Sequence, residues 1–425
     1  MKIYLDTVGC RLNQAEIESM ARQFRAAGHE ITGTPQGADL AVVNTCMVTA
    51  RAASDSRGKI RQIARAGAAQ IIATGCWATL QPDEAAGLPN VLRVVPNDHK
   101  DALVSEFLDL RPPTYDLEPL AREPLPGLRH RTRAFIKVQD GCDNHCTFCI
   151  TTIARGKGRS RSIGDVISDI QFALSGGSKE IVLTGVHLGA WGQDLGRHLR
   201  DLVRAILRES TVARLRLSSI EPWDLDQDFF SLWEDPRLCQ HLHLPLQSGC
   251  AATLKRMARK TSPESFRNLV GAAREIMPEV AITTDMITGF PGETESEFSE
   301  SLEFVRAMNF AGGHVFSFSP RPGTGAARMR EQVRPEVKKR RSRILQDSFE
   351  ESAQAYRSKF IGQTLPVLWE SKTDLGALGW QLEGHTGNYL RVRAVATSPR
   401  WNEMQQVELK ETLEQGLRGE INEMQ

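Results

Sequence analysis

The chain has 425 residues, 40% of them hydrophobic, so it can build two to four domains with sizeable cores. Lys and Arg number 53 against 52 Asp and Glu, and a net charge of +1 excludes any argument about partners from overall charge. No apolar run reaches the roughly 18–20 residues of a membrane span, and the N-terminus lacks a signal-peptide pattern. We therefore expect a cytoplasmic protein whose eight cysteines are metal ligands or buried thiols rather than disulfides.

Strands and helices alternate along the first expected domain, residues 1–117. We expect strands at 2–6, 40–43, 70–73 and 91–95, and helices at 13–28, 49–66 and near 99–109. This alternation predicts a parallel α/β sheet. A Pro-rich stretch over 111–126 indicates a linker to the next domain.

The second expected domain, residues 128–358, contains six strand candidates separated by helices. They lie at 135–138, 180–183, 215–218, 241–244, 282–286 and 315–318, and a charged helix follows over 328–359. Six units are fewer than the eight of a closed barrel, so we expect a partial (β/α)6 barrel. Residues 360–425 change to short strands, at 364–369, 379–383, 389–393 and 406–409, which predicts a small all-β domain.

Three cysteines, here called the loop triplet, lie in the run Cys142-Asp-Asn-His-Cys146-Thr-Phe-Cys149. Structural zinc sites and closed iron–sulfur sites normally use four protein ligands. Three thiolates on a 4Fe–4S cluster leave one iron open to a ligand that is not protein. The triplet follows the first barrel strand, so we expect it at the barrel mouth, where such folds keep their chemistry.

A second set, here called the edge triplet, consists of Cys10, Cys46 and Cys76. Each directly follows an expected strand, and the carboxyl ends of parallel strands lie along one edge of a sheet. We therefore expect the three thiols to converge, with Gly9 and Gly75 letting the backbone approach a bulky cluster. Buried structural thiols and a zinc site are the alternatives to a second iron–sulfur cluster.

These features resemble the methylthiotransferase family of radical S-adenosylmethionine enzymes, and the resemblance covers nearly the whole chain. The last domain is similar to a TRAM domain, an RNA-binding fold. The resemblance rests on the strings Thr7-Val-Gly-Cys-Arg-Leu-Asn-Gln-Ala-Glu16, Val43-Asn-Thr-Cys46, Gly141-Cys-Asp-Asn-His-Cys-Thr-Phe-Cys-Ile150, Arg155-Gly-Lys-Gly-Arg-Ser-Arg161, Leu244-Pro-Leu-Gln-Ser-Gly249 and Gly289-Phe-Pro-Gly-Glu293.

Within the family, three strings are most similar to the branch that acts on N6-threonylcarbamoyladenosine at position 37 of tRNA. They are Cys10-Arg-Leu-Asn-Gln-Ala-Glu16, Leu183-Thr-Gly-Val-His-Leu-Gly189 and Arg216-Leu-Ser-Ser-Ile-Glu-Pro222.

The resemblance implies two 4Fe–4S clusters and S-adenosylmethionine as cofactors. The loop triplet would hold the cluster that cleaves S-adenosylmethionine, and the edge triplet an auxiliary cluster that carries the inserted sulfur. One S-adenosylmethionine would methylate that sulfur and a second would supply the radical. C2 of adenine carries an unactivated C–H bond that an ordinary base cannot deprotonate, so we name no catalytic side chain.

The resemblance also implies partners. The substrate would be a tRNA anticodon loop with its target base splayed out. A reducing electron donor such as flavodoxin or ferredoxin and a sulfur donor would also be needed. We expect a monomer that does not contact membranes.

Residues at the strand ends would contact S-adenosylmethionine. Phe148 would flank its adenine, unless the ring only packs the loop. The other expected contacts are Gly185, Val186, Ser219, Glu221, Gln247 and Asp285, and a paired structural role is the alternative for Asp285.

Cations expected to contact tRNA phosphates follow the loop triplet and decorate the β domain: Arg155, Lys157, Arg159, Arg161, Arg391 and Arg393. Such contacts supply affinity without reading sequence, and a solvated face is the alternative.

Three other functions fit part of the pattern. Methylthiotransferases that act on isopentenyladenosine in tRNA or on an aspartate of a ribosomal protein would share both triplets and the architecture. A non-catalytic iron–sulfur or zinc protein that binds RNA would cleave no S-adenosylmethionine.

Overall fold

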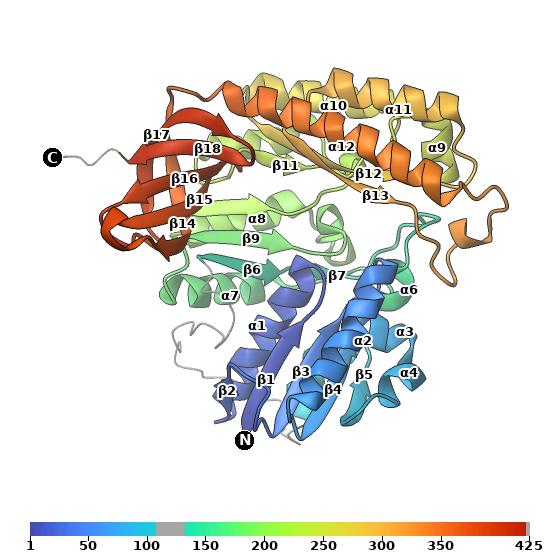
Figure 1. Ribbon diagram of the computed structural model, residues 1–425, viewed down its shortest axis with the longest axis vertical. Helices are drawn as coiled ribbons and strands as arrows, with labels where there is room; N and C mark the ends of the chain where they lie inside the picture. The colour runs from blue at the N-terminus through green and yellow to red at the C-terminus, as the bar shows by residue number, and fades with distance from the viewer. Residues whose placement is uncertain (108–131, 422–425) are drawn as a thin grey trace.

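The computed structural model describes residues 1–107 and 132–421. The predicted linker and the expected boundaries at 117 and 128 lie outside the described residues. The chain forms a sheet with flanking helices, a partial barrel beside it and a small closed barrel at one end of the partial barrel (Figure 1). The predicted fold class is confirmed.

The first sheet has the strand order β2-β1-β3-β4-β5, and all its pairs are parallel. Its strands are β1 (Lys2–Thr7), β2 (Glu30–Thr32), β3 (Leu40–Thr45), β4 (Gln70–Gly75) and β5 (Val91–Val95). Its helices are α1 (Arg11–Ala26), α2 (Ala50–Arg65), α3 (Cys76–Leu80), α4 (Pro82–Ala86) and α5 (Leu103–Phe107). β3 is buried along its whole length, as expected for a central strand covered on both faces. The short β2, with one buried residue, carried too little pattern to be predicted.

The partial barrel has six parallel strands in two hydrogen-bonded groups, β10-β9-β6 and β11-β12-β13, which isolated bridges such as Ser219 to His243 connect. The strands are β6 (Arg133–Lys137), β9 (Glu180–Thr184), β10 (Arg214–Leu217), β11 (His241–His243), β12 (Ala281–Thr288) and β13 (Gly312–Ser317). A short antiparallel pair of β7 (Gln139–Asp140) and β8 (Arg159–Ser160) frames residues 142–149, here called the cluster loop because they carry the loop triplet. The helices are α6 (Thr151–Arg155), α7 (Ile163–Ser175), α8 (Leu199–Glu209), α9 (Ala251–Arg256), α10 (Pro263–Ile276), α11 (Glu295–Met308) and α12 (Pro335–Ser358).

The predicted helix over 328–359 begins later than expected. A 3-10 turn, η6, takes Ala326–Arg328, and α12 begins at Pro335. Proline is favoured at a first helical position because its missing N–H has no intrahelical partner there.

The sheet packs through α1 against the inner face of the partial barrel, the face opposite to the one that α7 and α8 cover. Ala15 on α1 contacts Phe135 of β6 and Val182 of β9 in a small apolar cluster. The sheet therefore lies beside the barrel, with α3 against α6 near the cluster loop. Figure 1 shows the blue sheet below the green strands of the barrel in this arrangement.

The C-terminal module is a closed barrel in the order β14-β15-β16-β18-β17. Its strands are β14 (Thr364–Asp374), β15 (Trp380–Thr386), β16 (Arg391–Ala396), β17 (Met404–Leu413) and β18 (Gly416–Ile421). β18 was not predicted, because two glycines interrupt its apolar pattern. The module covers the end of the partial barrel where the strands begin (Figure 1).

A buried ion pair seats this module. Glu180 accepts hydrogen bonds from Arg216 Nε at 2.7 Å and Nη2 at 3.2 Å. Arg216 Nη1 also donates to the Gly387 carbonyl, at 3.0 Å. The Tyr389 ring then stacks on His241 with centroids 4.6 Å apart, so a side chain of the module forms the floor of the barrel.

We predict that Glu180→Gln destabilises the protein strongly. The change leaves the Arg216 cation buried without its carboxylate, which typically costs about 3–5 kcal/mol. Chemical denaturation at pH 7 would measure the loss. Glu420→Gln, which removes an exposed carboxylate paired with Lys410 and Arg418, should cost about 0–1 kcal/mol.

The same pair predicts acid sensitivity. Arg216 outweighs the effect of burial and lowers the pKa of Glu180 from 4.5 to about 2. The stabilisation is therefore present above pH 4.5 and is lost as the pH falls toward 2. A Glu180→Gln protein as stable as the wild type at pH 7 would contradict this account.

Candidate cluster-binding site

The edge triplet gathers at the carboxyl edge of the sheet, as the topology predicted. Cys10 lies between β1 and α1, Cys46 follows β3 and Cys76 begins α3 after β4. Burial raises the pKa of Cys46 to about 11, and the nearby thiols of Cys10 and Cys76 raise it too. The three sulfur atoms therefore share one electrostatic environment.

Glycine beside these cysteines serves close backbone packing. A Cβ at Gly9, where φ is +107°, would lie 2.6 Å from the Cys46 sulfur. At Gly75, where φ is +93°, it would lie 2.3 Å from the Thr45 carbonyl oxygen. Gly9 thus lets the backbone after β1 approach the Cys46 thiol closely, whereas Gly75 lets the backbone after β4 approach the end of the neighbouring strand β3.

The loop triplet lies between β7 and α6. The Cys142 N–H donates to the Gly156 carbonyl at 3.0 Å, and the Cys149 N–H donates to the Cys146 carbonyl at 3.0 Å. Burial raises the pKa of the Cys149 thiol, and the nearby Cys142 also raises it. The backbone thus closes this loop into a compact turn that gathers its thiols.

Each triplet offers a donor set that suits a 4Fe–4S cluster. In the part of the chain that the structure describes, no three His, Cys, Asp or Glu side chains are grouped to hold one ion. Structural zinc sites normally take four protein ligands, whereas each triplet has three thiols. A 4Fe–4S cluster offers a separate iron to each of three thiolates.

A buried guanidinium links the two triplets. Arg155, the last residue of α6, donates from Nη1 to Glu16 Oε1 and to Asp140 Oδ1, both at 2.8 Å. Its Nη2 donates to Asn13 Oδ1 at 2.8 Å, and the same oxygen lies 3.7 Å from the Cys10 sulfur. Arg155 was predicted to contact tRNA phosphate; this prediction is wrong for the described structure, because the side chain is buried and paired with carboxylates.

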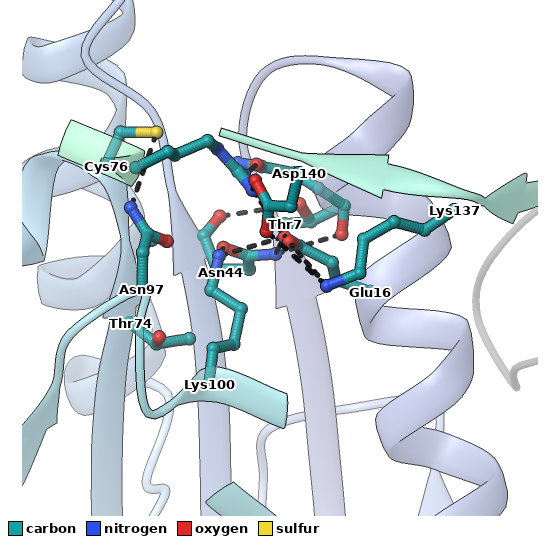
Figure 2. A network of polar contacts seen from close by, with 12 residues as sticks. Thr7, Glu16, Asn44, Thr74, Cys76, Asn97, Lys100, Lys137 and Asp140 are labelled. Atoms are coloured by element: carbon teal, nitrogen blue, oxygen red, sulfur yellow. Dashed lines mark hydrogen bonds and ion pairs between the residues drawn. The ribbon is translucent and has the colours of Figure 1, made fainter. Parts of the chain in front are cut away.

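The carboxylate of Glu16 is the centre of this network, and Figure 2 shows Lys100, Lys137 and Asp140 around it. Lys100 Nζ lies 2.9 Å from Glu16 Oε2, and Lys137 Nζ lies 3.6 Å from Oε1. Although burial opposes it, these cations and Arg155 hold the pKa of Glu16 well below its usual range. Glu16 is therefore ionised, and it ties the sheet to the barrel.

A second link passes through Asn97. Its Nδ2 donates to the Ala154 carbonyl of α6 at 2.8 Å and lies 3.8 Å from the Cys76 sulfur. The five-residue helix that follows Cys149 thus reaches partners of two thiols in the edge triplet.

Two of the expected cofactor contacts have protein partners. Phe148 packs edge-on against Phe290 with centroids 6.5 Å apart, so its ring is part of an apolar cluster. Glu221 accepts a hydrogen bond from Arg259 Nη2 at 2.6 Å, while Arg259 Nη1 lies 3.8 Å from the Cys146 sulfur.

The remaining expected contacts lie at or near the strand ends. A Cβ at Gly185 would lie 3.0 Å from Gln139 Oε1, and the neighbouring Val186 is half-buried. Ser219 is exposed, and Gln247 has a left-handed backbone, with φ at +78°.

The carboxylate of Asp285 lies 3.2 Å from His243 Nε2, which matches the paired structural role. His243 and His241 both contact the Thr283 hydroxyl, at 2.9 and 3.0 Å, while Nδ1 of His241 is buried without a hydrogen-bond partner in the described structure.

The cations predicted to bind RNA differ in their exposure and in their pairing with carboxylates. Lys157 and Arg159 are exposed beside the cluster loop. Arg161 is half-buried and pairs with Asp169 at 2.6 Å. In the β module, Arg391 and Arg393 both pair with Glu383, which neutralises part of their charge.

Sequence reasoning missed Arg259 and His187. His187 Nε2 lies 2.6 Å from Asp224 Oδ2, and Asp224 together with the Cys142 thiol outweighs burial and raises the pKa of His187 to about 10. Its Nδ1 lies 3.3 Å from Asn144 inside the cluster loop. His187 stands in one of the family strings, but Arg259 lies 110 residues beyond the loop triplet in no string, and only folding brings it near Cys146.

Two family models match the chain. The model described as "Uncharacterized protein family UPF0004" matches residues 2–95, and the "Radical SAM superfamily" model matches residues 136–305. The solved radical S-adenosylmethionine methyltransferase TsrM from Kitasatospora setae superposes with a TM-score of 0.57 over 77% of each chain. At 15% identity, that likeness shows the fold alone.

Curated relatives match over nearly the whole length. The chain is 38% identical to "Threonylcarbamoyladenosine tRNA methylthiotransferase MtaB" of Thermotoga maritima, over 98% of this chain and 96% of the relative. The Bacillus subtilis protein of the same name is 35% identical, over 91% and 88%. "tRNA-2-methylthio-N(6)-dimethylallyladenosine synthase" of Bacillus cereus is 33% identical, over 99% and 86%.

These matches confirm that the chain is an enzyme, against the non-catalytic alternative, with S-adenosylmethionine and 4Fe–4S clusters as its cofactors. None of the helices in the described residues is long and apolar enough to cross a membrane. The relatives are named for two different modified adenosines, and the chain matches both kinds over nearly its whole length. The chain therefore belongs to the radical S-adenosylmethionine methylthiotransferase family.

Proposed function

We propose that this enzyme converts N6-threonylcarbamoyladenosine at position 37 of tRNA to its 2-methylthio derivative. The observation that carries the substrate is the 38% identity to a T. maritima enzyme named for threonylcarbamoyladenosine tRNA. The 33% identity to a dimethylallyladenosine synthase makes a tRNA with that group the second candidate.

In this proposal the loop triplet holds the cluster that binds S-adenosylmethionine, and the edge triplet holds an auxiliary 4Fe–4S cluster. When bound, these groups supply the radical and the sulfur that the unactivated C2–H bond requires. The protein supplies thiolate ligands, excludes water and fixes the separation of the two clusters. Strand-end residues such as Gly185, Val186 and Ser219 remain our proposed S-adenosylmethionine contacts.

The α6 helix supports a fixed separation. It begins two residues after Cys149, and its last two residues contact Asn97 and Asn13, each of which lies beside a thiol of the edge triplet. A helix this short transmits position directly, because its five residues form little more than one turn and leave little length over which the helix could bend. We infer that α6 sets the distance between the clusters.

The tRNA would approach the mouth of the barrel, where Lys157 and Arg159 are exposed. Phosphate contacts there and on the β module would position the anticodon loop. An external one-electron donor, for which flavodoxin and ferredoxin are candidates, and a sulfur donor complete the proposed partners.

Single cysteine changes should separate the two clusters. Cys142→Ala and Cys46→Ala are each expected to lower iron after anaerobic reconstitution from about eight to about four atoms per chain. Cys46→Ala should still form 5′-deoxyadenosine on reduction, because the loop triplet is intact, whereas Cys142→Ala should not. Cys250→Ala, a buried thiol outside both triplets, is the control. Wild-type 5′-deoxyadenosine formation by Cys142→Ala would refute the ligand assignment.

Arg155→Lys tests the role of α6. Lysine keeps the charge but cannot reach Glu16, Asp140 and Asn13 together. We expect near-normal iron and 5′-deoxyadenosine, with methylthiolated product reduced about 10-fold or more, because misplacement by about 1 Å can cost about 100-fold. Arg93→Lys, at an exposed pair with Glu106, is the control. A parallel fall in iron content would mean that Arg155 only supports folding.

The substrate is tested by mass spectrometry of tRNA nucleosides from a strain that lacks this protein. The 2-methylthio derivative of N6-threonylcarbamoyladenosine should be absent and should return with the wild-type protein but not with Cys142→Ala. An unchanged level in the deletion strain, or loss of the dimethylallyl derivative instead, would overturn the proposed substrate.

A further inference from the structure

Among the buried arginines of the described residues, one has no carboxylate partner. The described residues bury six arginines: Arg155, Arg214, Arg216, Arg259, Arg321 and Arg341. Carboxylates of Glu16, Glu180, Glu221 and Glu293 lie within 4 Å of five of them. Arg321, only 6% exposed, has no carboxylate within that distance in the described part of the chain. Its Nη2 donates to the Ser319 hydroxyl at 2.6 Å.

The electrostatics agree with the geometry. Burial lowers the pKa of Arg321, and no neighbouring charge in the described structure offsets that effect. Arg321 Nε is also buried without a hydrogen-bond partner among the described residues. Nε of Arg259 and Arg341 is in the same state, but their other nitrogens bind carboxylates. A buried cation without a compensating anion is costly, so its retention points to an anion that is not part of the folded protein.

Arg321 lies on the segment 318–328, which packs against the cluster loop. On this segment the Ala326 N–H donates to the carbonyl of Thr147, at 2.8 Å. Phe318 belongs to the apolar cluster that includes Phe148. Thr147 and Phe148 stand between Cys146 and Cys149, so the segment lies next to the loop triplet at the barrel mouth.

A second cation adjoins the same segment. Lys338 Nζ donates to the Phe318 carbonyl at 3.0 Å and lies 5.1 Å from the centroid of the Phe318 ring. Burial lowers the pKa of Lys338 as well, and no carboxylate within 4 Å compensates it in the described structure. Two partly desolvated cations therefore contact neighbouring residues of this segment, Lys338 at the Phe318 carbonyl and Arg321 at the Ser319 hydroxyl.

We propose that Arg321, with Lys338 on the same segment as a second cation, binds an oxyanion of the tRNA substrate at the barrel mouth. The inference rests on the proposed function. A planar guanidinium can receive two oxygens at once, which suits both a carboxylate and a phosphate. The oxyanion has two possible sources on the same RNA: the carboxylate of the threonylcarbamoyl group, and a backbone phosphate next to the target base.

The test uses the full-length reconstituted enzyme and one tRNA sequence prepared with N6-threonylcarbamoyladenosine or with plain adenosine at position 37. Dissociation constants are measured at several salt concentrations for the wild type, Arg321→Gln and Arg321→Lys. Arg328→Gln, which removes an exposed charge from the same segment, is the matched control.

If the carboxylate is the ligand, Arg321→Gln weakens binding of the modified tRNA about 10-fold to 100-fold and leaves the plain tRNA unchanged. If a phosphate is the ligand, both tRNAs weaken equally and the salt dependence falls by about one unit. Either result supports the site, and Arg321→Lys should retain part of the binding. The phosphate result would stand even if the wild type failed to methylthiolate the modified tRNA, so the two proposals can fail separately.

Two outcomes would overturn the inference. The first is that Arg321→Gln binds both tRNAs with the same dissociation constants as the wild type and Arg328→Gln. The other is a raised KM for S-adenosylmethionine in 5′-deoxyadenosine formation without tRNA, which would assign Arg321 to that cofactor. Thermal unfolding is an independent readout: the free Arg321→Gln protein should be no less stable than the wild type, because it loses an uncompensated buried charge.

Discussion

A guanidinium that leaves water must be compensated, and this constraint shapes how the parts of the chain meet. Arg155 joins the sheet to the barrel through Glu16 and Asp140, and Arg216 joins the β module to the barrel through Glu180. Buried ion pairs add little net stability because desolvation offsets most of their attraction. Their directional hydrogen bonds fix relative position, which an enzyme with two separate clusters requires. The same constraint makes the uncompensated Arg321 informative.

The barrel lumen carries a continuous polar column from floor to mouth. Tyr389 stacks on His241, the two histidines share the Thr283 hydroxyl, and His243 pairs with Asp285. The Tyr389 hydroxyl also accepts a hydrogen bond from Arg11 at 3.0 Å, and Arg11 directly follows a cysteine of the edge triplet. All three parts of the chain therefore contribute to one set of contacts.

Local pattern predicted most of the fold. Apolar runs followed by glycine and cysteine located the strands and both triplets, because a strand end is a local feature. The role of Arg155 could not be predicted, because its carboxylate partner Glu16 lies 139 residues away in sequence and a cation in a basic run resembles a phosphate contact. The role of Arg216 was equally hidden from the sequence. It belongs to a string that suggested the substrate branch, yet its side chain donates to carbonyls of the β module.

The contact between Arg216 and the β module also sets an order of assembly during synthesis. Arg216 precedes Gly387, the carbonyl that it binds, by 171 residues. At about 5–20 residues per second, the ribosome delivers that carbonyl roughly 9–34 s after the arginine. Until then the charged ends of β9 and β10 stay in water, and Tyr389 cannot close the floor. During that interval the nascent chain carries both cysteine triplets, while the barrel still lacks the floor that Tyr389 provides.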